Sequence, residues 1–160
     1  MRKIPLKRRK PVHAAAVVLF ILYLVGLVYV LFFLEARDQT YHNVNLVPFK
    51  TIRMLFQYFF TYHHFSLWYW ISNVFGNILL LAPFGFLLPL IRHRRMNVWI
   101  ILLLSILLSA AIEGCQFFTG VGEADIDDVI LNATGALLGY GLYRFLGALF
   151  QSSSGGNPSC

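Results

Sequence analysis

The sequence contains few charged residues. Only 12% of its 160 residues are charged, whereas 58% are hydrophobic, and the mean hydropathy is +0.67. Ordinary soluble domains carry roughly 25% charged residues. The shortage of charge, together with long apolar runs, excludes an ordinary soluble domain and indicates a polytopic membrane protein.

Cysteines and cofactor motifs are also scarce. The two cysteines, Cys115 and Cys160, form no CxxC pair, which excludes a disulfide framework and a cysteine-based zinc site. No nucleotide-binding motif is present, so the chain is not a self-contained ATP-driven pump. The acidic run 125–128 lacks the alternating Asp/Asn and Gly pattern of an EF-hand. We therefore expect no cofactor and no metal, with a loose divalent site in this run as the alternative.

The net charge of +6 is unevenly distributed. Six of the thirteen basic residues lie in the first ten positions. Beside an apolar run, such a cluster indicates membrane topology and contact with anionic lipids. We therefore expect membrane lipids as partners and no nucleic acid.

Four apolar runs are long enough to cross a hydrocarbon core, for which about 20 helical residues suffice. They cover residues 14–34, 67–91, 98–118 and 129–150. The first run exceeds the roughly 7–15 apolar residues of a secretory signal peptide, which is the alternative for this segment. The predicted organisation is a basic cytoplasmic tail at 1–13, a membrane domain at 14–150 and a flexible cytoplasmic tail at 151–160.

A different pattern follows Pro48. Phe49, Ile52 and Phe56 recur near helical spacing, and Lys50 and Arg53 occupy the other side. This pattern predicts an amphipathic helix that lies at the membrane surface. The predicted fold class is therefore an all-α membrane protein, with four transmembrane helices and an interfacial amphipathic helix between the first and second.

Two features inside the predicted spans concern helix packing. Pro83 interrupts the second apolar run, so we expect a kink whose freed carbonyl a neighbouring helix satisfies. Gly135 and Gly139 form a small-xxx-small step in the fourth run, which permits close approach of another helix.

The charge distribution predicts the orientation. With both termini in the cytoplasm, ten of the thirteen basic residues are cytoplasmic, and only Arg37, Lys50 and Arg53 lie outside. The opposite orientation would put the dense basic clusters outside, against the positive-inside rule. The acidic segment before the fourth span is therefore predicted to face the exterior.

Polar side chains from three spans are predicted at similar depth on the outer side, and their spacings of three or four residues place each pair on one helical face. A charged group at membrane depth costs about 2.5–3.5 kcal/mol on insertion scales and usually faces a bundle interior or a wet cavity. We therefore expect an outward-opening pocket that binds a ligand. Its predicted residues are Asn73, Asn77, Glu113, Gln116, Asp128 and Asn132.

Structural roles compete with this interpretation. Asn and Gln side chains can simply hold membrane helices together. Asp125 can be the N-cap of the fourth helix, with Asp127 in its first turn, although Asp125 is also kept as a predicted ligand-binding residue. Glu113 and Asp128 are the candidate general bases if the protein is an enzyme, because burial raises a carboxyl pKa toward the working pH. Whether it is an enzyme stays open.

Four segments of the chain resemble the VanZ-like family, small bacterial membrane proteins named for a teicoplanin-resistance protein. They are VNLVPFKTI at 44–52, NVFGNILLLAPFGFLLP at 73–89, EGCQ at 113–116 and DIDDVILNATGALLGYG at 125–141. The segments occur in family order and the resemblance covers roughly residues 15–148. Family members often carry an Arg in the loop before the DIDD stretch, where this chain has Glu123.

The resemblance implies a cell-envelope protein of the bacterial cytoplasmic membrane and, as in some members, lowered susceptibility to teicoplanin. On this basis we expect the pocket to bind a lipid, a lipid-linked cell-wall precursor or a lipophilic glycopeptide antibiotic. The alternatives are a membrane-embedded enzyme that acts on a lipid head group, and a small transporter or accessory subunit that works as an oligomer.

Overall fold

The computed structural model describes residues 6–31, 44–62, 67–92, 96–120 and 124–153, which include four long apolar helices. These are α1 (Leu6–Tyr29), α3 (Leu67–Arg92), α4 (Val98–Thr119) and α5 (Ile126–Ser153). The stretches apolar enough to cross a membrane are Pro11–Tyr29, Ser72–Arg92, Val98–Thr119 and Ile126–Phe150. The predicted fold class is therefore confirmed: an all-α membrane protein with four spanning helices.

The helices are longer than the apolar runs from which they were predicted. Helix α1 begins at Leu6, within the predicted basic tail, and α5 continues to Ser153. Helix α4 ends at Gly120, which adopts the left-handed conformation (φ 71°) that favours glycine at a helix C-cap. Asn97 caps the other end of α4, because its side chain accepts a hydrogen bond from the Trp99 N–H.

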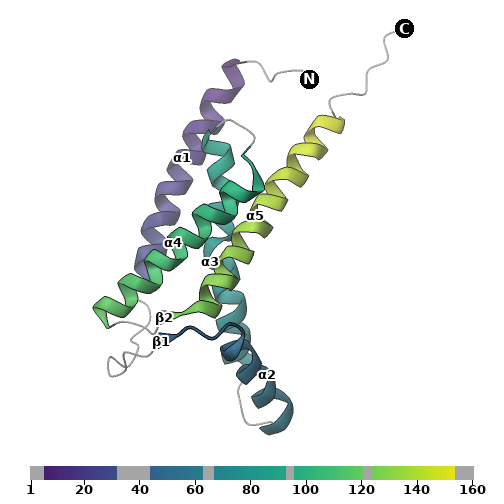
Figure 1. Ribbon diagram of the computed structural model, residues 1–160. Helices are drawn as coiled ribbons and strands as arrows, with labels where there is room; N and C mark the ends of the chain where they lie inside the picture. The colour runs from purple at the N-terminus through teal and green to yellow at the C-terminus, as the bar shows by residue number, and fades with distance from the viewer. Residues whose placement is uncertain (1–5, 32–43, 63–66, 93–95, 121–123, 154–160) are drawn as a thin grey trace.

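A shorter helix, α2 (Lys50–Tyr62), lies between the first and second spanning helices, as expected from the amphipathic pattern. It contacts α3 and α5 and lies at the end of the bundle opposite both chain termini (Figure 1). Two very short strands, β1 (Val44–Asn45) and β2 (Ala124–Asp125), pair in parallel. In the chain, β1 comes just before α2 and β2 comes just before α5. The location of α2 at the membrane surface stays a prediction.

Helices α3 and α5 run in the same direction and touch along their backbones. A Cβ added to Gly135 would overlap the Ile78 carbonyl oxygen, and one added to Gly139 would overlap that of Ala82. Likewise, a Cβ added to Gly85 of α3 would overlap the Ala136 carbonyl oxygen. The predicted small-xxx-small contact is therefore confirmed. Any side chain at these glycines would force the two helices apart.

Helices α1 and α4 flank this pair. The Tyr23 hydroxyl of α1 donates to the Leu80 carbonyl oxygen at 2.8 Å. Pro83 has no N–H group, so the carbonyl oxygen of Leu79, four residues earlier, lacks its helical donor. The Leu80 carbonyl oxygen that accepts from Tyr23 belongs to the next residue. On the other side, the Tyr140 hydroxyl of α5 donates to the Met96 carbonyl oxygen at 2.6 Å, just before α4. The core where these helices meet consists of Leu81, Phe84, Met96, Ile101, Ala136 and Tyr140.

Much of the apolar surface remains uncovered. On α1, the side chains of Leu22 and Val25 are 62% and 64% exposed, and Leu79 of α3 is 66% exposed. A contiguous apolar surface of this kind is costly in water but suits contact with lipid chains. The outside of the bundle therefore agrees with a multi-pass membrane protein.

Candidate functional site

The β1–β2 pair joins two segments that are about 80 residues apart in the chain. Asn45 is paired with Asp125, and the Asn45 side chain donates to the Asp125 Oδ1 at 3.0 Å. The Thr51 hydroxyl donates to the Asp125 Oδ2 at 2.6 Å. The Asp125 Oδ1 also accepts from the Asp127 N–H at 2.8 Å, in the first turn of α5. Asp125 is therefore the N-cap of α5, as its position predicted.

Asp127 is fully buried and caps a different helix. Its carboxylate accepts N–H groups from the start of α2: Oδ1 accepts from Phe49, and Oδ2 accepts from Thr51 at 2.8 Å and from Ile52 at 3.2 Å. The first N–H groups of a helix have no partner within the helix. The sequence predicted that Asp127 would support its own helix, α5. Asp127 does lie in the first turn of α5, and its carboxylate in addition supplies the acceptor that the start of α2 lacks.

We call this arrangement the clasp: Asn45, Thr51, Asp125 and Asp127 with the N–H groups of Phe49, Thr51 and Ile52. Phe49 has a φ of 62°, a left-handed conformation that is rare for a bulky residue. This conformation turns the chain so that the N–H groups of Phe49, Thr51 and Ile52 reach one carboxylate. The clasp thereby fixes the start of α2 against the start of α5.

A second group of polar side chains lies between the spanning helices. We call it the polar cluster: Asn73, Asn77, Ser109, Glu113, Gln116, Asp128 and Asn132. The Asn77 amide donates to the Asp128 Oδ1 at 2.6 Å, joining α3 to α5. The Asn132 amide donates to the Ser109 hydroxyl at 2.8 Å, joining α5 to α4. Both pairs bridge different spanning helices.

Helical spacing places these contacts in successive layers. Helices α4 and α5 are antiparallel, because Ser109 meets Asn132 whereas Tyr140 meets Met96. Glu113 lies one turn beyond Ser109, and Asp128 lies one turn before Asn132, so the two carboxylates are in the next layer toward the clasp. The Glu113 Oε2 accepts the Asp125 N–H at 3.1 Å, which connects the polar cluster to the clasp.

The cluster is largely removed from solvent. Glu113 is 8% exposed, Gln116 4% and Asn132 1%. Two amide oxygens, Asn73 Oδ1 and Asn132 Oδ1, are buried and accept no hydrogen bond from the described residues. Buried polar atoms in native proteins nearly always have a partner. These two acceptors therefore mark places where a donor from outside the chain would fit.

Hydrogen bonds thus involve five of the seven predicted site residues: Asn77, Glu113, Asp125, Asp128 and Asn132. The other two, Asn73 and Gln116, lie one helical turn from Asn77 and Glu113. The roles of all seven in binding or catalysis stay predictions. Sequence analysis missed Asn45, Thr51 and Ser109 as partners, because nothing local shows that residues 45 and 51 reach Asp125. Glu123, which stands where relatives often carry Arg, lies outside the described residues.

Metal-binding and thiol chemistry find no support in the part of the chain that the structure describes. Within these residues, no group of three or more His, Cys, Asp or Glu side chains is arranged to hold a metal ion. Cys115 is exposed on α4 and is unpaired.

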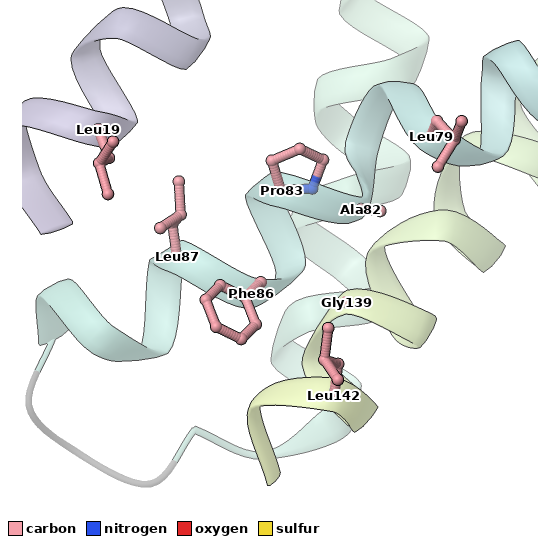
Figure 2. Close-up of a pocket in the computed structure, with 8 residues that line it drawn as sticks. All are labelled: Leu19, Leu79, Ala82, Pro83, Phe86, Leu87, Gly139 and Leu142. Carbon is pink, nitrogen blue, oxygen red and sulfur yellow. The ribbon is translucent and has the colours of Figure 1, made fainter. Parts of the chain in front are cut away.

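An apolar groove occupies another part of the bundle. It has a volume of about 390 Å³ and lies between α1, α3 and α5, as Figure 2 shows. The α3 residues that line the groove, from Leu79 to Leu87, point to the side of the helix opposite Asn77, about 180° around its axis. The groove and the polar cluster are therefore on different sides of α3. Its lining residues are Leu19, Leu79, Ala82, Pro83, Phe86, Leu87, Gly139 and Leu142.

The clasp and the polar cluster consist of residues in the four segments that resemble one family, with Ser109 added. A family model described as VanZ/LLP1 matches residues 20–147, which is most of the chain. The protein belongs to the VanZ/LLP1 family. The match includes α2, the clasp, the polar cluster, α3, α4, most of α5 and the second half of α1 of this VanZ/LLP1 protein. No curated protein and no solved structure matches the chain.

Proposed function

We propose that this VanZ/LLP1 protein binds the polar part of a lipid, a lipid-linked cell-wall precursor or a lipophilic glycopeptide at the polar cluster. The observation that carries the proposal is the meeting of carboxylate and amide side chains from three membrane helices at one end of the bundle, through Asn77–Asp128 and Glu113–Asp125. Ionisable groups at membrane depth are costly to insert, and they usually serve a function.

The hydrogen-bond pattern supports ligand binding at the polar cluster rather than at the clasp. Both oxygens of Asp125 and of Asp127 already accept hydrogen bonds from the chain itself. In the polar cluster, by contrast, the amide oxygens of Asn73 and Asn132 have no donor. Hydroxyl and amine groups of a sugar or a lipid head group are donors that match these acceptors.

The orientation of the chain is part of the proposal. Both termini lie at the same end of the bundle, and α2 and the clasp lie at the other (Figure 1). With the basic N-terminal segment and the end of α5 in the cytoplasm of a bacterium, as the positive-inside rule favours, the polar cluster lies at the outer face of the cytoplasmic membrane. A protein at that face is accessible to envelope lipids, to exported cell-wall precursors and to antibiotics.

The proposal is tested with Glu113→Gln and Asp128→Asn, which keep the shape of each side chain and remove its charge. Binding of teicoplanin to the purified protein is measured, along with teicoplanin susceptibility of cells that produce each variant at equal level. We expect roughly tenfold weaker binding for the double variant, and susceptibility equal to that of cells lacking the protein.

Asn97→Ser is the control, because it keeps a cap on α4 at the opposite end of the bundle. A glycopeptide that lacks a lipid tail provides the comparison ligand. The proposal fails if the double variant matches the unaltered protein both in teicoplanin binding and in retention of lipids or lipid-linked precursors from the envelope. Hydrolysis of a lipid-linked substrate by the purified protein would instead indicate an enzyme.

A further inference from the structure

Two basic side chains at the start of α2 have no partner. Lys50 and Arg53 are exposed, and the part of the chain that the structure describes contains no ion pair to either residue. They nevertheless flank Thr51 and Ile52, whose N–H groups bond to Asp127.

The clasp keeps its carboxylates away from these cations. Asp127 is fully buried, and its two oxygens accept hydrogen bonds from backbone N–H groups of the α2 start. The oxygens of Asp125 accept from Asn45, Thr51 and the Asp127 N–H. The clasp carboxylates are therefore already engaged, and none of the described carboxylates forms an ion pair with Lys50 or Arg53.

Exposed aromatic residues adjoin this basic side of α2, at its boundary with the apolar side. The side chains of Phe56 and Phe60 are 56% and 60% exposed, and their ring centroids are 4.5 Å apart. Steps of three, three and four residues connect Lys50, Arg53, Phe56 and Phe60, so they form one stripe along the helix. We call these four residues the α2 stripe. Basic residues followed by aromatic residues are typical of helices that lie where head groups meet acyl chains.

The position of the stripe is fixed by tertiary contacts. The clasp holds its basic end, and α2 also contacts α3 and α5. The N–H groups of the α2 start are already occupied by Asp127, so an anion would be bound by the side chains and not by the helix terminus. The structure therefore presents a rigidly placed pair of cations and an exposed aromatic pair at one end of a membrane bundle.

We propose that the α2 stripe is a binding surface for the phosphate-bearing head group of a membrane lipid. The Arg53 guanidinium offers a planar pair of donors that matches a phosphate, and Lys50 adds a second positive charge. Phe56 and Phe60 contact the glycerol and upper acyl region of the same lipid. The surface is separate from the polar cluster and does not depend on which ligand the cluster binds.

The test uses the full-length protein purified in a neutral detergent and titrated with phosphatidic acid, with bound lipid counted by native mass spectrometry. The variant carries Lys50→Gln and Arg53→Gln. We expect phosphatidic acid to bind the variant roughly tenfold more weakly. Diacylglycerol, which has the same chains without the phosphate, is expected to bind both proteins weakly and equally.

The matched control is Arg92→Gln, which removes an exposed arginine at the opposite end of α3 and is expected to leave phosphatidic acid binding unchanged. Equal losses in the control and the double variant would show unspecific charge attraction and overturn the proposal. So would unchanged binding by the double variant, or binding of diacylglycerol as tight as that of phosphatidic acid.

Further variants separate the two sources of phosphate and the two sites. Phe56→Ser with Phe60→Ser is expected to weaken phosphatidic acid binding, and inorganic phosphate is expected to compete poorly with the lipid. Competition by inorganic phosphate at equal concentration would show a site for free phosphate and overturn the lipid assignment.

Glu113→Gln with Asp128→Asn is expected to leave phosphatidic acid binding intact, so failure of the proposed function and failure of this surface give different results.

If the double variant does not fold, Lys50→Arg with Arg53→Lys tests the same surface with both charges kept. This exchange is expected to retain phosphatidic acid binding and its preference over diacylglycerol. Loss of that preference with the fold preserved would overturn the proposal.

Discussion

The clasp and the polar cluster use the same kinds of side chain in opposite ways. In the clasp, both oxygens of Asp125 and of Asp127 accept hydrogen bonds from the chain. In the polar cluster, the Asn73 and Asn132 amide oxygens are buried without a donor. Saturated groups specify a structure, whereas an unsatisfied buried acceptor favours a ligand that supplies the missing donor. Asp127 belongs to the clasp, whereas Asp128, the next residue, belongs to the polar cluster.

The largest effect is expected from Asp127→Ala. This change leaves three N–H groups at the α2 start without their acceptor, and we expect it to lower the free energy of unfolding by about 3–5 kcal/mol. Thermal unfolding in detergent measures the effect. Asp128→Ala, at the next position, is the comparison and is expected to cost less than about 2 kcal/mol, because its contact with Asn77 is a hydrogen bond between membrane helices. Equal losses would contradict the division between clasp and cluster.

A smaller effect of opposite sign is expected from Phe49→Gly. Phe49 has a φ of 62° and an exposed side chain, so glycine removes a conformational penalty and loses little packing. We expect the free energy of unfolding to rise by up to about 1 kcal/mol, so the variant is more stable. Phe56→Gly, in the regular part of α2, is the control and is expected to destabilise. A loss of stability at position 49 would show that the Phe49 side chain matters more than its backbone conformation.

The smallest effect is expected inside the polar cluster, from Ser109→Ala. The Asn132 amide loses its acceptor, and hydrogen bonds between membrane helices contribute on average about 0.6 kcal/mol. Chemical denaturation in mixed micelles measures the change, and Ser105→Ala is the control, because its hydroxyl donates only to the Leu102 carbonyl within its own helix. A cost as large as that of Asp127→Ala would show that the cluster is as structural as the clasp.

Predictions based on local pattern proved the most accurate. Hydropathy located all four spanning helices, and the glycine spacing identified the contact of Gly135 and Gly139 with α3. The N-cap role of Asp125 followed from its place before an apolar helical run, and the structure confirms it. These features depend on a few neighbouring residues, so periodicity and capping preferences reveal them.

Predictions that required a distant partner were less complete. Asp127 lies in the first turn of α5, as expected, but its contacts with the start of α2 were not anticipated. Asn45 and Thr51 carried no signal beyond their place in a family-like segment. The Asn77–Asp128 pair was anticipated only as a shared depth in the membrane, and the structure shows it as a contact.

The sequence by itself determined that this is a four-span membrane protein, because hydrophobicity and helical spacing are properties of neighbouring residues. Only the tertiary structure decided which carboxylates the chain uses for itself. The parallel pairing of β1 with β2 joins segments about 80 residues apart and brings the N–H groups of Phe49, Thr51 and Ile52 to Asp127. Whether a carboxylate is saturated depends on the groups that folding places beside it, and no local pattern contains that information.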